Sequence, residues 1–141
     1  MNGIIQPLRK YADFNGRASR AEFWTFVIFV TLLTFAAHQI DAGRGERVAI
    51  ALNMGIVELS TMLLLLLPTV AVGVRRLHDT GRSGWWMMLV YLPWLGTFAS
   101  GDNQSLILVA AGALLLGGTV WIVMMLLPGE RVENAHGQPP A

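Results

Sequence analysis

The chain has no cysteine, and only 13% of its 141 residues are charged while 54% are hydrophobic. The absence of cysteine excludes disulfide scaffolds, thiolate zinc sites and cysteine nucleophiles. An ordinary soluble domain carries roughly 25% charged residues, and a protein this small has a large surface to cover. So little charge beside so much apolar surface predicts a chain that lies in lipid. The net charge of +1 gives no reason to expect a nucleic-acid partner.

Four apolar runs account for most of the hydrophobic residues. They are residues 23–40, 56–74, 85–100 and 106–127. Each is expected to be a helix, because an unpaired backbone amide in lipid costs several kcal/mol. The first run would extend about 27 Å and the third only about 24 Å, so the third is the least certain span. Residues 48–55, which contain Asn53, are expected to lie in the outer interface.

The basic residues predict the orientation of these helices. Cytoplasmic loops of membrane proteins carry an excess of Lys and Arg. If both termini are cytoplasmic, eight of the ten basic residues lie inside, and only Arg44 and Arg47 lie outside. Trp85 and Trp86 then fall at the inner headgroup layer, as in aromatic belts. We therefore predict an all-α polytopic membrane protein, a four-transmembrane-helix bundle over residues 23–127 with both termini cytoplasmic.

The two ends of the chain flank this bundle. Residues 1–22 are expected to be a cytoplasmic N-terminal segment. Ser19 and Glu22 have the spacing of a capping box, so the first helix should begin there. A proline and a glycine at the start of residues 128–141 end the fourth helix. The composition of this last segment predicts a flexible cytoplasmic tail.

Two polar motifs on the cytoplasmic side carry a family resemblance. One reads Gly-Arg-Ala-Ser-Arg-Ala-Glu-Phe-Trp (residues 16–24), and the other reads Arg-Arg-Leu-His-Asp-Thr-Gly-Arg-Ser-Gly-Trp-Trp (residues 75–86). With them the chain resembles, from about Tyr11 to Gly137, the "domain of unknown function 805" family of small bacterial inner-membrane proteins. The resemblance implies a four-helix, multi-pass protein of the bacterial cytoplasmic (inner) membrane, and it implies no activity.

Arginines dominate the second motif. Arg75, Arg76 and Arg82 would place forked donors beside a headgroup layer rich in phosphate, which Arg binds in a bidentate manner. Each basic residue near an anionic leaflet contributes on the order of 1 kcal/mol. The simpler alternative is that these arginines only anchor the topology. An anchor, however, does not require the His78-Asp79 pair within the same loop.

Other chemistry finds less support in the sequence. A metal site needs three or four ligands, and the remaining histidines, His38 and His136, lie far from His78 in the sequence. No metal and no cofactor are therefore expected. Ser83 follows His78 and Asp79, but a catalytic triad is defined by geometry and not by proximity in a loop. An enzyme is accordingly not the favoured interpretation.

The predicted spans contain a few polar and small residues. His38 and Glu58 fall about one turn from the outer surface and could pair between the first two helices. Pro68 would remove one backbone hydrogen bond from its helix, as would Pro93 in the next. Residues 113–117 form a small-xxx-small step that allows close helix contact, within one chain or between copies.

The leading hypothesis is a non-enzymatic membrane protein whose basic cytoplasmic face binds anionic lipid headgroups or a partner protein. A homo-oligomer is also open. A small transporter or channel component is the first alternative, and an interfacial enzyme acting on a lipid or a phosphorylated substrate is the second. The residues expected to bind are Arg17, Arg20, Arg75, Arg76 and Arg82, and those expected to orient them are Glu22, His78 and Asp79.

Overall fold

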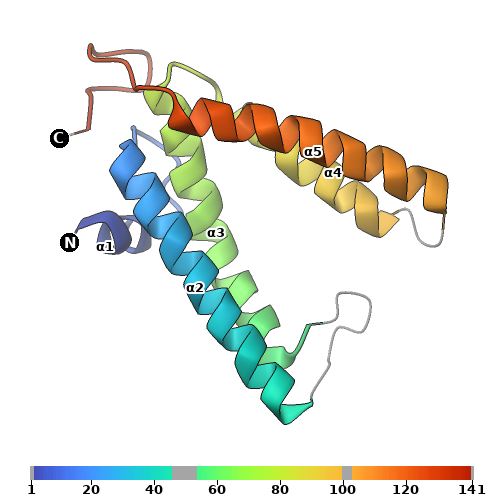
Figure 1. The fold of residues 1–141 in the computed structure, drawn as a ribbon. Coiled ribbons are helices and arrows are strands. Elements are labelled where there is room, and N and C mark those ends of the chain that lie inside the picture. Colours follow the sequence, from blue (N-terminus) through green and yellow to red (C-terminus); the bar gives the residue numbers. More distant parts are fainter. Residues whose placement is uncertain (1, 46–53, 100–102, 141) are drawn as a thin grey trace. The chain divides into compact units, whose positions relative to one another are not determined.

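The computed structural model describes residues 2–45, 54–99 and 103–140, and within these ranges every regular element is a helix (Figure 1). The elements are α1 (Asn2–Arg9), α2 (Arg20–Arg44), α3 (Ile56–Asp79), the 3-10 helix η2 (Gly84–Met87), α4 (Met88–Ala99) and α5 (Gln104–Leu126). The prediction of an all-helical fold is confirmed.

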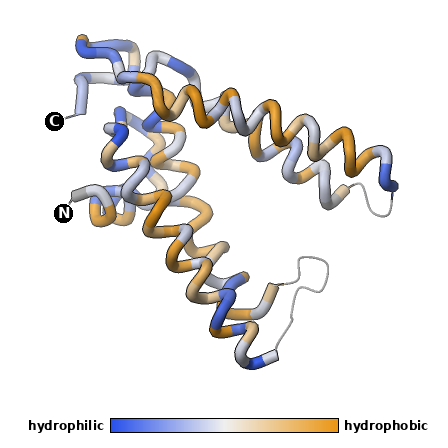
Figure 2. The backbone as a smooth tube through the Cα atoms, viewed as in Figure 1, coloured by the Kyte–Doolittle hydropathy of each residue, from blue (hydrophilic) through white to orange (hydrophobic). Residues whose placement is uncertain are grey.

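Three of these helices, α2, α3 and α5, are long and apolar enough to cross a membrane. Figure 2 shows that hydrophobic residues occupy most of their length. Helix α4 has 12 residues, about 18 Å, which is short of a hydrocarbon core of roughly 30 Å. The third apolar run is divided because Ser83 caps a 3-10 turn, its side chain accepting a hydrogen bond from the amide of Trp85. A fourth crossing therefore stays a prediction.

The chain divides into two compact units. Unit 1 contains Met1–Phe14 and Ala21–Val72, and unit 2 contains Asn15–Arg20 and Gly73–Ala141.

In unit 1, α2 and α3 lie side by side (Figure 1). The buried carboxylate of Asp41, near the end of α2, accepts hydrogen bonds from the amides of Val57 (3.2 Å) and Glu58 (2.7 Å). It thereby caps the first turn of α3, whose amides have no partner within the helix. One turn earlier, His38 Nδ1 lies 2.9 Å from Glu58 Oε2. The structure therefore forms the pair that the sequence left open. Of the predicted interfacial segment 48–55, residues 48–53 lie outside the described residues, and α3 begins at Ile56.

Unit 1 also shows how a proline is accommodated in a long apolar helix. Pro68 is fully buried inside α3, and its missing N–H leaves the carbonyl of Leu64 without its helical donor. The hydroxyl of Tyr11 donates a hydrogen bond to that carbonyl. Tyr11 follows α1, a short helix that lies against α2 because Gly3 contacts Thr25. Helix α1 was not predicted, since its eight residues include a glycine and a proline.

In unit 2, α4 lies along α5 (Figure 1). Pro93 deprives the carbonyl of Leu89 of its helical donor, and that carbonyl faces Gly117 of α5 so closely that an added methyl group would overlap it. The small-xxx-small step at residues 113–117 thus serves contact within one chain. The lack of a side chain at Gly117 sets how closely the two helices approach.

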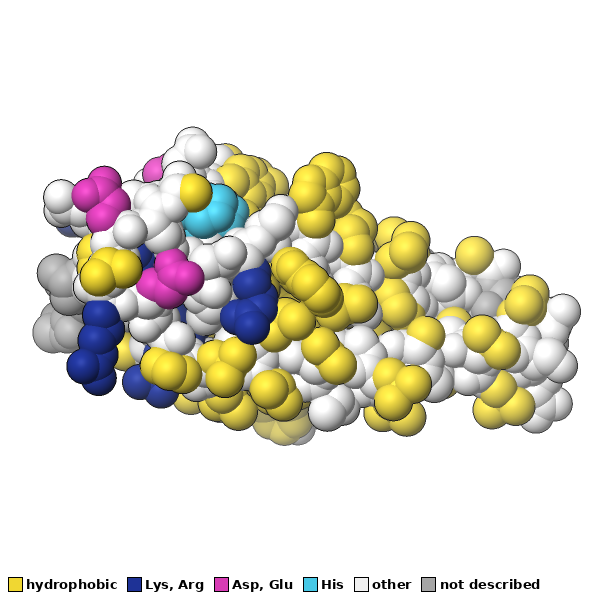
Figure 3. Space-filling view, turned by 90° about the horizontal axis from the view of Figure 1, so that it is seen from above, with side chains coloured by type: hydrophobic (Ala, Val, Ile, Leu, Met, Phe, Trp, Pro, Cys, Tyr) yellow, Lys and Arg dark blue, Asp and Glu magenta, His cyan; other side chains and the backbone are white. Residues whose placement is uncertain are grey.

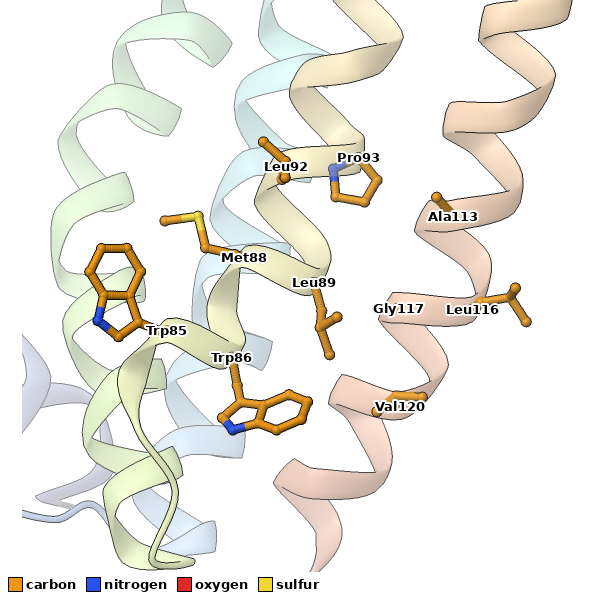
Figure 4. A pocket seen from close by; sticks show the side chains of 10 residues that line it. All are labelled: Trp85, Trp86, Met88, Leu89, Leu92, Pro93, Ala113, Leu116, Gly117 and Val120. Atoms are coloured by element: carbon orange, nitrogen blue, oxygen red, sulfur yellow. The ribbon is translucent and has the colours of Figure 1, made fainter.

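An apolar groove of about 790 Å³ runs beside this contact (Figure 4). We call it the α4–α5 groove. In Figure 4, Trp86, Leu89 and Pro93 reach toward α5, whose Ala113 is directed toward them. Its walls are formed by Trp85, Trp86, Met88, Leu89, Leu92 and Pro93 on one side and by Ala113, Leu116, Gly117 and Val120 on the other.

We expect Gly117→Ala to destabilise the protein by about 1–3 kcal/mol, the usual cost of overpacking a close contact. Gly112→Ala is the matched control on the same helix, because a methyl group there would meet no neighbour within 4 Å. Thermal unfolding in detergent, followed by circular dichroism, compares the two variants with the wild type. Equal unfolding temperatures for both variants would contradict the close approach of α4 to α5.

Candidate functional site

The polar residues of the second sequence motif lie at the C-terminal end of α3, in unit 2. Helix α3 ends in a Schellman motif, in which the amide of Arg82 donates to the carbonyl of Leu77 (3.0 Å) and that of Gly81 to the carbonyl of His78 (3.1 Å). Gly81 adopts a φ of 70°, a left-handed conformation that glycine tolerates without steric cost. The turn holds the last residues of α3 in helical register up to Asp79.

The carboxylate of Asp79 joins two buried arginines. Its Oδ1 accepts a hydrogen bond from Nε of Arg17 (2.9 Å) and lies 2.9 Å from Nη2 of the same guanidinium, and its Oδ2 pairs with Nη1 of Arg76. The exposed fraction of the side chain is 1% for Arg17, 0% for Arg76 and 5% for Asp79. We refer to these three residues as the Arg-Asp-Arg cluster. The cluster takes three charges out of water and keeps them paired, as buried charges require.

Backbone carbonyls of the C-terminal segment satisfy the other donors of the two guanidinium groups. Arg17 Nη1 donates to the carbonyls of Val132 (2.8 Å) and Gly137 (3.2 Å), and Nη2 donates to that of Glu130. Arg76 Nε donates to the carbonyl of Met125 (3.2 Å), and Nη2 donates to that of Leu127. The cluster therefore organises residues 125–137 around the end of α3.

His78 holds the same segment from another side. Its ring stacks on that of His136 with the centroids 3.8 Å apart and the planes 2° from parallel. The Nδ1 atom of His78 lies 3.2 Å from the carbonyl oxygen of Gly16. The side-chain amide of Asn134 donates a hydrogen bond to the backbone carbonyl of His78 (3.0 Å). The sequence predicted that residues 128–141 form a flexible tail, and within this segment Asn134 and His136 make these contacts with His78.

A small hollow of about 220 Å³ opens beside the cluster. Arg20 and Arg131 line it and are exposed, whereas Arg76 and Asp79 form its floor. Glu130 also lines the hollow and accepts a hydrogen bond from Asn134 through its carboxylate (2.7 Å). In Figure 3, basic, acidic and histidine side chains gather over the C-terminal segment, while hydrophobic side chains cover α5.

Comparison with known proteins identifies the family of the chain. A family described as "Protein of unknown function (DUF805)" matches residues 11–138. The chain belongs to this family.

The chain is also similar to three proteins of Escherichia coli (strain K12). "Inner membrane protein YhaH" is 38% identical over 96 residues, which cover 68% of this chain and 78% of that protein. "Inner membrane protein YhaI" is 31% identical over 96 residues, covering 68% of this chain and 76% of that protein. "Uncharacterized protein YiiR" is 32% identical over 146 residues, covering 89% of this chain and 84% of that protein. No solved structure matches the chain.

Within this DUF805 chain, burial separates the five arginines that the sequence singled out. Arg17, Arg75 and Arg76 are buried, whereas Arg20 is exposed and Arg82 is half-buried. The hydrogen bond from Arg20 to the carbonyl of Leu126 (3.5 Å) and that from Arg82 to the carbonyl of Thr80 (3.4 Å) are both long, and bonds of this length are weak. Within the described ranges, neither Arg20 nor Arg82 pairs with a carboxylate.

The three residues expected to orient the arginines have different surroundings. Asp79 orients Arg17 and Arg76 directly. His78 contacts the backbone of Gly16 and the ring of His136 instead of an arginine. Glu22 is buried in the first turn of α2. No group of three or more His, Asp or Glu side chains able to hold a metal ion occurs among the residues that the structure describes.

Sequence reasoning missed the part of the site that the C-terminal segment supplies. The contributions of Glu130, Val132 and Gly137 to Arg17 are backbone carbonyls, and a carbonyl leaves no side-chain signal in the sequence. Arg131 was counted only for the topology, although it lines the hollow. Its position after the helix-ending proline and glycine was the available signal.

We expect Asp79→Asn to destabilise the protein by about 3–5 kcal/mol, because it leaves two buried guanidinium groups without a counter-charge. The exposed Glu133 provides a control, and Glu133→Gln should change stability by less than about 0.5 kcal/mol. Denaturant unfolding in detergent micelles measures both. If Asp79→Asn were as stable as the wild type, the Arg-Asp-Arg cluster would not contribute to the stability of the fold.

Proposed function

We propose that this protein crosses the bacterial inner membrane four times, with both termini in the cytoplasm. Three helices have the length and composition for crossing, and two of the relatives are named inner membrane proteins. The fourth crossing would consist of η2 and α4, which together extend about 26 Å. A span of this length is accommodated by modest local thinning of the bilayer. The charge distribution supports the orientation, because only Arg44 and Arg47 then face outward.

We further propose that the cytoplasmic face binds anionic lipid headgroups. The observation that supports this most directly is the division of the arginines by burial. Arg17 and Arg76 use their donors inside the protein, whereas Arg20, Arg82 and Arg131 present guanidinium groups that pair with no carboxylate of the described residues. Such groups bind phosphate oxygens through two parallel hydrogen bonds.

The buried arginines support this role without needing to touch a ligand. The Arg-Asp-Arg cluster holds the C-terminal segment in place, and that segment positions Arg131 beside Arg20 at the hollow. A preorganised pair of guanidinium groups loses less conformational entropy when it binds. A soluble partner protein with an acidic surface could bind the same arginines. Lipid headgroups are the favoured ligand because they always lie next to a membrane protein.

The topology can be tested by labelling, because the chain has no native cysteine. Gln138→Cys and Ala42→Cys place single thiols at exposed positions on the two predicted sides. In intact bacterial cells, a membrane-impermeant maleimide should label Ala42→Cys and should reach Gln138→Cys only after the cells are lysed. Labelling of Gln138→Cys in intact cells would contradict a cytoplasmic C-terminus.

Headgroup binding can be tested with a triple variant in which Arg20, Arg82 and Arg131 are each changed to Gln. We expect the preference for phosphatidylglycerol over phosphatidylcholine, measured by native mass spectrometry of protein released from mixed nanodiscs, to fall by roughly fivefold for each arginine removed. Arg44→Gln removes one exposed charge outside the proposed site, so its preference should stay well above that of the triple variant. An unaltered preference in the triple variant would refute headgroup binding.

A further inference from the structure

Specific residues of α4 and α5 form the α4–α5 groove. The backbones meet where the freed carbonyl of Leu89 lies against Gly117, so the small residue that permits the contact also leaves space beside it. Ala113, one turn earlier on α5, extends that space. Pro93 and Trp86 form the facing wall (Figure 4).

The groove offers water few hydrogen-bond partners. Its walls carry no charge and are almost wholly apolar. Its volume of about 790 Å³ lies in the range of pockets that hold one elongated small molecule. In a bilayer the molecules next to such a surface are lipid acyl chains.

The ends of the groove differ and give an occupant one direction. Trp85 and Trp86 stand at one end, and the exposed fraction of Trp85 is 77%. Tryptophan concentrates where headgroups meet hydrocarbon. Arg82 precedes Trp85 by three residues and pairs with no carboxylate of the described residues. A cation at the headgroup level beside an apolar channel is complementary to a molecule with an anionic head and a hydrocarbon tail.

We infer that the α4–α5 groove holds one acyl chain of an anionic phospholipid, with the chain running from Trp85 toward Pro93 and the phosphate at Arg82. The site rests on the headgroup binding proposed above and adds a bound chain to it. It makes the lipid a bound ligand with a defined place on the protein. The exposed surface of α5 around Leu115 would contact only exchanging lipid.

A photoreactive lipid locates the bound chain. The full-length protein is reconstituted with phosphatidylglycerol that carries a diazirine in one acyl chain, irradiated, digested and sequenced by mass spectrometry. Labels should concentrate on groove residues such as Leu92, Pro93 and Ala113 over Leu115, whose exposed fraction is 73%. Labels spread equally over Leu115 and the groove would overturn the inference, and this comparison needs no variant.

Two substitutions test the groove against a matched surface. Ala113→Trp fills the groove from its α5 wall, while Leu115→Trp adds an indole on the exposed face of the same helix. Ala113→Trp should remove most groove labelling, and Leu115→Trp should leave it unchanged. Circular dichroism and the labelling of α2 show whether each variant is folded. Undiminished groove labelling in a folded Ala113→Trp protein would refute the acyl-chain site.

The lipid headgroup separates this inference from the proposed function. With phosphatidylglycerol, Arg82→Gln should lower groove labelling by roughly fivefold (about 1 kcal/mol), and with phosphatidylcholine it should have no effect. Equal groove labelling by both lipids would overturn the anionic headgroup while the acyl-chain site stands. A preference for phosphatidylglycerol without groove labels would uphold headgroup binding and overturn the site. Absence of groove labels with both lipids, in a protein that is dimeric in detergent, would assign the groove to a second copy.

Discussion

The C-terminal end of α3 depends on the ion pairs that the carboxylate of Asp79 forms with Arg17 and Arg76. One carboxylate serves two guanidinium groups, and all three side chains are almost fully withdrawn from solvent. Two cations beside one anion leave more donors than Asp79 can accept, so the remaining N–H groups require other acceptors. The carbonyls of residues 125–137 supply them. The course of the C-terminal segment thus follows from the need to satisfy arginines that are buried.

The same requirement operates along the apolar helices. Each internal proline of α3 and α4 frees one carbonyl, and in lipid no water is present to satisfy it. Tyr11 donates a hydrogen bond to the carbonyl freed by Pro68, whereas the carbonyl freed by Pro93 lies against the backbone of Gly117. At the start of α3, the carboxylate of Asp41 accepts hydrogen bonds from amides that have no partner within the helix. These contacts are long-range in sequence, since 53 positions separate Tyr11 from Leu64 and 16 separate Asp41 from Val57.

Buried and exposed arginines have different roles in this account. The buried Arg17 and Arg76 hold the C-terminal segment against the end of α3. They can do so because a guanidinium has five donors and can bind several backbone carbonyls at once. Arg20 and Arg131, on that surface, keep their charge available to a phosphate. Arg82 precedes Trp85, one of the tryptophans that line the α4–α5 groove, by three residues. The proposed headgroup site and the proposed acyl-chain site therefore meet at the membrane boundary, where a phospholipid changes from polar to apolar.

The sequence by itself determined the helical class, the apolar runs and the involvement of Asp79 with neighbouring arginines, because hydropathy and charge are properties of residues and of short spacings. It also indicated His38 and Glu58 as a possible pair, since both fall near the same depth. Only the tertiary structure decided which arginines are buried, that α4 begins with a 3-10 turn, and that His136 stacks on His78. The carbonyls that complete the Arg-Asp-Arg cluster belong to residues of any side chain, 113–120 positions from Arg17. Backbone partners at that separation are chosen by the folded path of the chain, and no local pattern encodes them.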